Sequence, residues 1–475
     1  MKKILALMMS LIVMFSLVAC SSGNTQSDEN KHNEQNNTNK GHQDNNKNSN
    51  REDLSLKVSR DEKKTITISV LGKHPDFVLA AKEYEKKHPN IKIELKSFAS
   101  GGGALSALQL EKYVAQTTTE VLSGKGADLF ILNDQSLPLD RYIDKNAFVN
   151  LNQYIEKDTS FDKSQYYMNI LEHSKVNGGL YVLPTHFSLG ALIGNQEAIS
   201  KTGVQIDDRQ NWTWDRFTEI SKQLKAKGTL DTAMVVSPVG ILNPLVFSNE
   251  NYDQLVDTEK NEAHFDSPFF IDLLERVKKM YDDNVLSDNQ VGVMRTTYFT
   301  SSPIYSANDY AMRAAIYYQN AANIYDFPHS SEKESGVTFS GYDRYAMNAN
   351  STVKMEAWDY LKFLLSYEIQ TQSVSGMFPV NIAANEKEFT DVIEGKVENT
   401  KGSGGKGGKG GAVTVSEASL EPLKQMISEA NTQIRWNEKI RTIIEEESNS
   451  YFKGQKSAQS VADIIQNRVM TYLNE

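Results

Sequence analysis

Alternating strand and helix patterns near the start of the folded part constrain this chain more than any other feature. Residues 65–71 and 91–95 alternate apolar and polar side chains, which is the period of a β-strand, and residues 128–132 read as a short buried strand. Helical patterns separate these strands, with apolar side chains on one face of residues 77–84 and 113–122. This order predicts an α/β fold with a largely parallel sheet.

One edge of that sheet is a predicted ligand-binding edge. Ligands of open α/β sheets bind beyond the carboxyl ends of the strands. Lys73 and His74 follow the first strand, and Asn133 and Asp134 follow the third. Because parallel strands end at the same edge of a sheet, we expect these four side chains to lie close together.

A pair of glycines opens a second informative stretch. Residues 180–183 read as a strand that Pro184 ends, and residues 191–193 read as the next strand. His186 and Phe187 lie between the two. A strand, a polar and aromatic elbow, and a further strand are typical of a chain that crosses from one lobe to another. The same residues, taken alone, fit an ordinary hairpin in a single core at least as well.

Later patterns predict two capped helices, two further strands and an amphipathic helix. Thr213 and the pair Ser267-Pro268 are typical helix starts. Residues 314–318 and 343–347 read as strands, and residues 351–367 form an amphipathic helical pattern.

Polar and aromatic side chains flank these later strands and are further candidates for the ligand site. Gln319 and Asn320 follow the first of them, and Tyr342 and Asp343 lie where the second begins. Three tryptophans lie on helical faces and are expected in the core instead: Trp212, Trp214 and Trp358.

Length and charge narrow the class of protein. A chain of 475 residues exceeds one typical core, so two domains or lobes are expected. Its 51 Lys and Arg against 61 Asp and Glu leave a formal net charge of −10. This balance argues against nucleic acid as the main partner, because phosphate neutralisation requires clustered positive charge.

The N-terminus predicts export and lipidation. Lys2 and Lys3 precede an apolar segment, residues 4–19, that is short for a membrane span and fits a secretory signal peptide. The sequence Leu-Val-Ala-Cys at its end resembles a bacterial lipobox, in which Cys20 is acylated and becomes the first residue. Residues 1–19 are therefore predicted to be a lipoprotein signal peptide. Cys20 is the only cysteine of the chain, which excludes disulfides and thiolate metal sites.

Two polar, low-complexity segments are predicted to lack a fixed structure. Residues 20–60 hold too few apolar side chains to offset their ordering entropy and are expected to be a disordered tether behind the lipid. Residues 401–411 (KGSGGKGGKGG) are expected to be a flexible connector. They contain a formal GxGxxG pattern, but no strand precedes it, so a dinucleotide site is not expected.

Catalytic and metal-binding motifs are missing from the sequence. It contains no HExxH, no GxSxG, no kinase signature and no EF-hand loop, and its histidines show no i, i+4 pairs. The expectation is a protein that is not an enzyme and that has no metal and no cofactor. Two catalytic carboxylates without a recognisable spacing remain compatible with the sequence.

Short motifs along the chain resemble those of family 1 extracellular solute-binding proteins, the sugar-binding lipoprotein components of ABC importers. Each motif is loose, whereas their order and spacing are specific. Gly194 replaces the usual tyrosine, and Arg216 replaces an acidic residue. The matching segments are residues 89–94 (PNIKIE), 123–130 (SGKGADLF), 178–184 (GGLYVLP), 213–217 (TWDRF), 313–316 (RAAI), 357–365 (AWDYLKFLL) and 376–380 (GMFPV).

The resemblance implies an α/β, two-lobed periplasmic-binding-protein-like fold of type II. In such a fold each lobe is a mostly parallel sheet flanked by helices, and crossover hinge segments join the lobes. We expect residues 61–186 and 346–400 to form the N-terminal lobe, and residues 187–345 and 412–475 the C-terminal lobe, with 401–411 as the Gly-rich connector.

It also implies a function, a partner and a place in the cell. The chain is expected to be a monomeric receptor on the outer face of the bacterial cytoplasmic membrane, anchored there by its lipid. It would close two lobes on a mono- or oligosaccharide and deliver it to the transmembrane subunits of an ABC permease. Sugars require aromatic faces and planar polar groups. The candidate ligand-binding residues are Lys73, His74, Asn133, Asp134, His186, Phe187, Gln319, Asn320, Tyr342 and Asp343.

Three alternatives stay open on the sequence. The same fold binds non-sugar solutes, such as a peptide, a polyamine or a metal complex. A sensory lipoprotein would present its ligand to a membrane kinase instead of a permease. A surface hydrolase would require two close carboxylates at the site.

Overall fold

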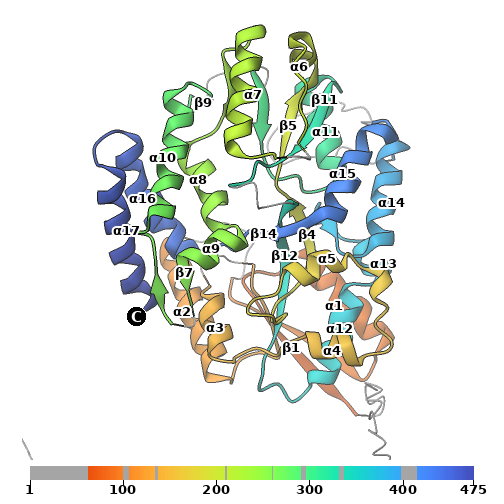
Figure 1. Ribbon diagram of the computed structural model, residues 1–475. Helices are drawn as coiled ribbons and strands as arrows, with labels where there is room; N and C mark the ends of the chain where they lie inside the picture. The colour runs from red at the N-terminus through yellow and green to blue at the C-terminus, as the bar shows by residue number, and fades with distance from the viewer. Residues whose placement is uncertain are drawn as a thin grey trace, which may run out of the picture. The chain divides into compact units, whose positions relative to one another are not determined.

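The computed structural model (Figure 1) describes residues 62–99, 106–133, 137–208, 211–258, 260–289, 296–330, 336–396 and 415–474. The predicted signal peptide 1–19, Cys20 with its tether 20–60, Asp134 and the connector 401–411 lie outside these residues.

The first sheet has seven strands and contains the first strand that the structure describes. Its strand order is β13-β4-β12-β3-β1-β2, and β14 pairs with β12. β1 pairs in parallel with β2 and β3, whereas β12 runs antiparallel to β3 and β4. The strands are β1 (Lys64–Val70), β2 (Ile91–Ser97), β3 (Leu129–Ile131), β4 (Leu183–Leu189), β12 (Val337–Met347), β13 (Phe378–Pro379) and β14 (Ala430–Gln433).

Helices α1 (Pro75–Lys87) and α2 (Ala107–Ser123) connect the parallel strands of this sheet. α1 begins with a proline at its first position, where the missing N–H costs no hydrogen bond, and its face with Phe77 and Tyr84 is buried. α2 begins at a Ser106 capping box. The order β1-α1-β2-α2-β3 confirms the strand and helix alternation predicted from the sequence.

The second sheet has five strands in the order β11-β5-β10-β6-β9. β6 pairs in parallel with β10 and β9, and β5 runs antiparallel to β10 and β11. Both sheets are therefore mixed. The strands are β5 (Ala191–Asn195), β6 (Thr232–Val235), β9 (Leu286–Ser287), β10 (Thr297–Ser301) and β11 (Ala322–Asp326).

Two helices beside the second sheet begin where the sequence predicts. α7 (Trp214–Lys227) is capped by Thr213, whose side chain accepts a hydrogen bond from the Arg216 N–H, and α10 (Pro268–Asp282) is capped by Ser267. The remaining elements are α3 (Leu139–Asp144), α4 (Asn152–Lys157), η1 (Lys163–Gln165), α5 (Met168–His173), α6 (Gln196–Thr202), α8 (Pro238–Phe247), α9 (Asn249–Leu255), β7 (Val256–Asp257), β8 (Glu262–Ala263), α11 (Ala307–Tyr318), α12 (Lys354–Leu364), α13 (Tyr367–Gln370), α14 (Ile382–Ile393), α15 (Glu417–Glu429), α16 (Glu438–Phe452) and α17 (Ala458–Leu473).

None of the helices in the described stretches combines the length and the apolar character that crossing a membrane requires.

The three tryptophans expected in the core are buried. Trp212, Trp214 and Trp358 are 2%, 0% and 1% exposed, which confirms the prediction. The Trp358 indole N–H donates to Oδ2 of Asp158 at 2.8 Å, and the Lys362 ammonium lies 2.8 Å from the same oxygen. These two donors compensate the burial of the Asp158 carboxylate beside the hydrophobic core of the first sheet.

Asp158 should make the free energy of unfolding depend on pH in the acid range. Burial raises the pKa of its carboxyl, but hydrogen bonds from Lys362, Ser160 and Trp358 outweigh this and lower the pKa to about 2. The unfolded pKa is about 3.9, so the native state gains about 2 kcal/mol above that pH and loses it as pH falls toward 2. Asp158→Asn should lower the urea midpoint at pH 7 and converge with the parent near pH 2. Asp231→Asn, at an exposed position, is the control, and equal pH profiles for Asp158→Asn and the parent would contradict this account.

The strand expected at residues 180–183 is placed wrongly. β4 begins at Leu183 and continues through Pro184 to Leu189, so His186 and Phe187 lie inside a strand and not at an elbow. Proline is tolerated because β13 pairs only with Phe187 and His186, which leaves no strand beside Pro184 on that side. The chain turns into β5 at Gly190, where a Cβ would lie 2.1 Å from the Thr338 hydroxyl and would force that side chain to move.

The strand expected at residues 314–318 is also wrong, because these residues form the last turns of α11. Ser306 caps the helix, and Tyr310, Ala314 and Tyr318 are buried along one face. The helical spacing begins seven residues before the stretch that reads as a strand, and burial of the tyrosines overrides its β-branched and aromatic content. Gln319 ends the helix in a left-handed conformation.

Candidate functional site

Asp343 is the centre of a polar cluster at the edge of the first sheet. It lies in β12 with a φ of 45°, between the cross-strand pairs Tyr342–His186 and Arg344–Pro184. Its Oδ1 accepts a hydrogen bond from Nδ2 of Asn133 at 2.8 Å, and its Oδ2 lies 3.2 Å from Nδ1 of His186. The tertiary structure thus joins three of the predicted ligand-binding residues.

The environment of Asp343 keeps its carboxylate charged. Burial raises the pKa of Asp343, but hydrogen bonding and charge interaction with His186, the Asn133 hydrogen bond and the charge of nearby His74 outweigh it and lower the pKa. The side chain is 14% exposed. A partly buried anion next to exposed polar side chains is suited to orient hydroxyl donors.

His186 connects this cluster to a small cavity. Its side chain is almost fully buried, and Nδ1 lies 3.0 Å from the Thr185 hydroxyl. Among the residues that the structure describes, Nε2 has no hydrogen-bond partner. The cavity of about 20 Å³ that His186 lines with Asp76 and Ser373 is large enough for one water molecule. A bound water is the simplest partner for this nitrogen.

Replacing Asp343 should separate backbone strain from side-chain bonding. A left-handed conformation costs an L-residue about 1–2 kcal/mol, and Asn tolerates it better than Ala. We expect Asp343→Ala to destabilise the fold more than Asp343→Asn by about 1 kcal/mol in urea unfolding. Asp343→Gly removes the carboxylate without strain and is the control. Equal stabilities of the Ala and Gly variants would show that strain contributes nothing.

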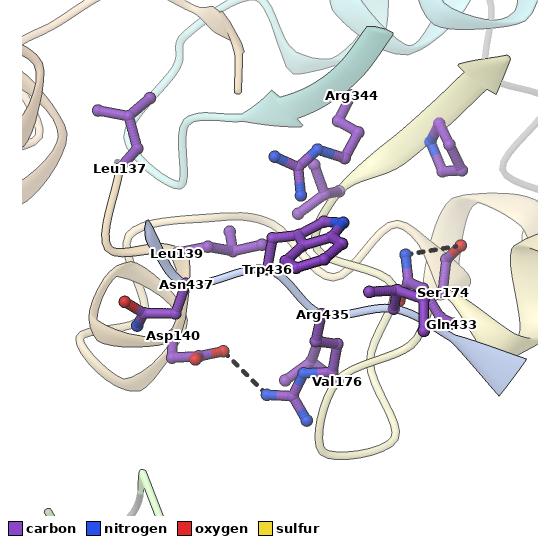
Figure 2. A pocket seen from close by; sticks show the side chains of 13 residues that line it. Leu137, Leu139, Asp140, Ser174, Val176, Arg344, Gln433, Arg435, Trp436 and Asn437 are labelled. Carbon is purple, nitrogen blue, oxygen red and sulfur yellow. Dashed lines mark hydrogen bonds and ion pairs between the residues drawn. The ribbon is translucent and has the colours of Figure 1, made fainter. Parts of the chain in front are cut away.

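Arg344 links the Asp343 cluster to a second pocket. Its N–H donates to Oδ1 of Asn133 at 3.0 Å, and its Nη2 donates to the Leu132 carbonyl. Asn133 therefore holds the Asp343 side chain and the Arg344 backbone at once. The guanidinium of Arg344 lines the pocket drawn in Figure 2.

We call this second pocket the Trp436 pocket. Its volume is about 40 Å³, and Figure 2 shows Arg344 and Trp436 projecting into the same space. The half-buried indole of Trp436 packs on Phe247, with 5.4 Å between ring centroids. The lining residues are Leu137, Leu139, Asp140, Ser174, Val176, Val182, Pro184, Arg344, Gln433, Ile434, Arg435, Trp436 and Asn437.

The side chains of the Trp436 pocket suit a sugar, but the volume of the pocket is too small for one. An indole face suits the apolar face of a sugar ring, and guanidinium, amide and carboxylate groups bind paired hydroxyls. At about 40 Å³ the pocket admits only water-sized molecules. Entry of a larger ligand therefore requires the elements that line it to move apart.

Two tyrosines join the sheets next to this region. Tyr305 follows β10 of the second sheet, and Tyr342 belongs to β12 of the first; their ring centroids lie 6.2 Å apart in an edge-on arrangement. Burial and the neighbouring Tyr342 raise the pKa of Tyr305.

The other predicted residues occupy varied places. Lys73 is exposed, and His74 caps α1, its Nδ1 accepting from the Asp76 N–H at 3.4 Å. Phe187 is 0% exposed and stacks on Phe378 in the first core. Gln319 and Asn320 are exposed at the end of α11 and line neither of the two pockets described.

Sequence reasoning missed the segment that carries Trp436. The only available signal was its position: Trp436 stands between the end of β14 and Asn437, whose side chain caps α16. A tryptophan between a strand end and a helix start lies at an edge where ligands bind. Within the described ranges, no group of three or more His, Cys, Asp and Glu side chains is arranged to hold a metal ion.

Two mixed sheets, joined where β4 of the first runs directly into β5 of the second, are the architecture expected of a two-lobed solute-binding protein. The chain belongs to the bacterial extracellular solute-binding protein family, whose model matches residues 74–371. This confirms the family inferred from the motifs.

Known proteins support the family and the fold. The chain is 22% identical to the sn-glycerol-3-phosphate-binding periplasmic protein UgpB of Rhizobium meliloti (strain 1021), over 64% of this chain and 70% of that protein. It is 28% identical to the lactose-binding protein of Rhizobium radiobacter, over 31% of this chain and 32% of that protein. The solved structure of the sugar-binding protein MalE from Xanthomonas citri matches with a TM-score of 0.61 at 14% identity, covering 86% of this chain and 97% of that one. The predicted two-lobed α/β fold is confirmed.

Proposed function

We propose that this protein captures a carbohydrate in the Trp436 pocket and delivers it to an ABC importer. The observation that carries the proposal is the pairing of Trp436 with Arg344 in one pocket, beside the Asp343 cluster. An aromatic plane next to planar hydrogen-bonding groups is the combination that sugar recognition requires. A relative named for lactose and a neighbour named as sugar-binding support this ligand class.

The proposed ligand contacts come from the Trp436 pocket and from the edge of the first sheet around Asp343. Asn133, Tyr342, Lys73 and His74 stand at the edge of the first sheet, and Asp343 and His186 hold that edge in place. Asp134, Gln319 and Asn320 remain proposed contacts of a longer ligand. The complete burial of Phe187 supports a packing role for it instead.

Lobe closure is the proposed mechanism. We expect the two sheets to move as separate bodies, with β4, β12 and β14 remaining in the first sheet and β5, β6, β9, β10 and β11 forming the second. The ligand favours the closed state only by its greater affinity for that state. The closed form would dock on the permease, and the protein would perform no chemistry on its ligand.

A lipid at Cys20 would keep the receptor at the membrane. The lipobox-like sequence at the end of residues 1–19 supports this, and two acyl chains bind a bilayer stably. The polar tether 20–60 would let the monomeric receptor reach the permease from the outer face of the cytoplasmic membrane. Metabolic labelling with a fatty acid, lost in Cys20→Ser, tests the anchor.

Thermal unfolding of the chain from Arg51 onward, against a panel of mono- and oligosaccharides, tests the ligand class. A ligand present at 100 times its dissociation constant stabilises the folded state by about 2.7 kcal/mol. We expect one sugar class to raise the midpoint without being converted. Glycerol 3-phosphate and a set of peptides and polyamines are the comparison arms. Stabilisation by one of these alone would overturn the carbohydrate proposal.

A further inference from the structure

Arg435 stands beside Trp436 in sequence and bonds to three separate elements. Its backbone N–H donates to the Phe247 carbonyl at the end of α8, at 2.7 Å. Its Nη2 lies 2.9 Å from Oδ1 of Asp140 on α3, and its Nη1 pairs with Asp253 on α9. The guanidinium also lies over the Tyr252 ring, 5.1 Å from its centroid. One side chain therefore ties α3 and α9 to the segment that carries the indole.

The two carboxylates around Arg435 are not equivalent. The Arg435 and Asp140 side chains are 12% and 19% exposed, whereas Asp253 is 63% exposed. Burial lowers the pKa of Arg435, but the charges of Asp140 and Asp253 outweigh it and raise the pKa, so the guanidinium stays charged. Solvent screens the Asp253 pair, and the shielded Asp140 pair is the stronger of the two.

These contacts connect two of the protein's hydrophobic cores. Tyr142, on the same helix as Asp140, belongs to a core with Phe130 of β3 in the first sheet. Tyr252 belongs to the core of the second sheet, together with Phe247. Because Arg435 is bound to α8 through its backbone and rests on Tyr252, its link to Asp140 is the contact that must break when α3 moves away.

We propose that Arg435 is a positioning residue of the ligand site: through Asp140 it holds the segment around Trp436 against α3, and so sets the orientation of the indole and the balance between narrow and open states of the pocket. The inference rests on the proposed function for its biological meaning. Its structural content, a Trp436 held by the Arg435–Asp140 pair, stands without any ligand.

The expected consequence is a shift toward the open pocket when the pair is removed. A hydrogen bond between charged partners in a shielded site accounts for about a tenfold change in such an equilibrium. Loss of Asp253 should have little effect, because Tyr252 and the α8 backbone still hold Arg435 on that side.

Acrylamide quenching of tryptophan fluorescence in the full-length, ligand-free chain tests this directly. The other three tryptophans are 2% exposed or less, so quenching reports on Trp436. Trp436→Phe should remove most of the quenchable signal and thereby validate the probe. We expect Asp140→Asn and Arg435→Met to increase quenching, and Asp253→Asn to leave it unchanged. Arg216→Met is the matched control, because Arg216 forms an exposed ion pair with Glu219 on one helix.

The outcomes separate this inference from the proposed function. Unchanged quenching in Asp140→Asn overturns the inference, whatever the thermal midpoint does. Equal increases in quenching for Asp140→Asn and Asp253→Asn overturn the claim that the Arg435–Asp140 pair is the contact that holds the pocket narrow. If Arg435→Met does not fold, the near-isosteric Asp140→Asn decides the question. Lactose serves as the ligand probe: quenching changes without lactose binding leave the inference standing and count against lactose as the ligand.

Discussion

Trp436→Ala is expected to weaken carbohydrate binding by about thirtyfold or more, which corresponds to about 2 kcal/mol. The indole is half buried, packs on Phe247 and lines the pocket beside Arg344. Buried aromatic anchors of this kind carry a large share of binding energy, because they offer a broad flat surface at a low cost in conformational entropy. Isothermal titration with the sugar that stabilises the parent most measures the effect.

Two variants control this experiment. Trp436→Phe keeps an aromatic plane and should retain part of the affinity, whereas Tyr367→Ala removes an aromatic side chain that is 48% exposed and lines neither pocket. Without ligand, the thermal midpoint should change little in Trp436→Phe and Tyr367→Ala and should fall in Trp436→Ala, which loses the packing on Phe247, so affinity is measured at a temperature where every variant is folded. Parent-like affinity in Trp436→Ala would place the ligand elsewhere and remove the observation on which the proposed function rests.

Phe187→Ala should lower the free energy of unfolding by about 3–5 kcal/mol. Its ring is 0% exposed, stacks on Phe378 with 5.4 Å between centroids, and meets Tyr167 edge-on at 5.9 Å. Deleting it leaves a cavity in the middle of β4 that neighbouring aromatic rings cannot fill without leaving their rotamers. Guanidinium unfolding, monitored by circular dichroism, measures the loss.

Phe187→Leu is the matched control, because it keeps most of the apolar volume and should cost well under half as much. Sugar affinity at a temperature where the Leu variant is fully folded should equal that of the parent. If Phe187→Leu had parent-like stability but had lost sugar affinity, Phe187 would be a ligand contact whose side chain becomes exposed on binding.

Part of the candidate site follows from the sequence. Because parallel strands end at one edge of a sheet, the sequence predicts that Asn133 lies near His74. In the structure Asn133 bonds to Asp343 and the charge of His74 acts on the same carboxylate, whereas Lys73 is exposed and Asp134 lies outside the described residues. The contribution of these side chains to ligand binding stays a prediction.

Phe187 shows why local sequence patterns did not predict the rest of the site. Pro184, three residues before Phe187, predicts the end of a strand and therefore an elbow at which the ring is open to ligand. Whether a proline ends a strand depends on its neighbours, and the short β13 leaves the side of Pro184 without a partner. Similarly, the aromatic and β-branched residues within 314–318 favour a strand, yet the segment belongs to α11. The helix forms there because it buries Tyr310 and Tyr318 on one face.

The sequence by itself determined the features that arise within a few residues or along a single period. The caps at Thr213 and Ser267, the apolar face of α1 and the order of strands and helices depend on local backbone chemistry and on side-chain spacing, both of which are written in the chain. Tertiary structure decided which distant side chains meet. Asn133 reaches Asp343, and Asp140 reaches Arg435, only because strand register and helix packing bring together segments more than 200 residues apart. Such contacts depend on the balance of burial and hydrogen bonding over the whole fold, and no local pattern encodes that balance.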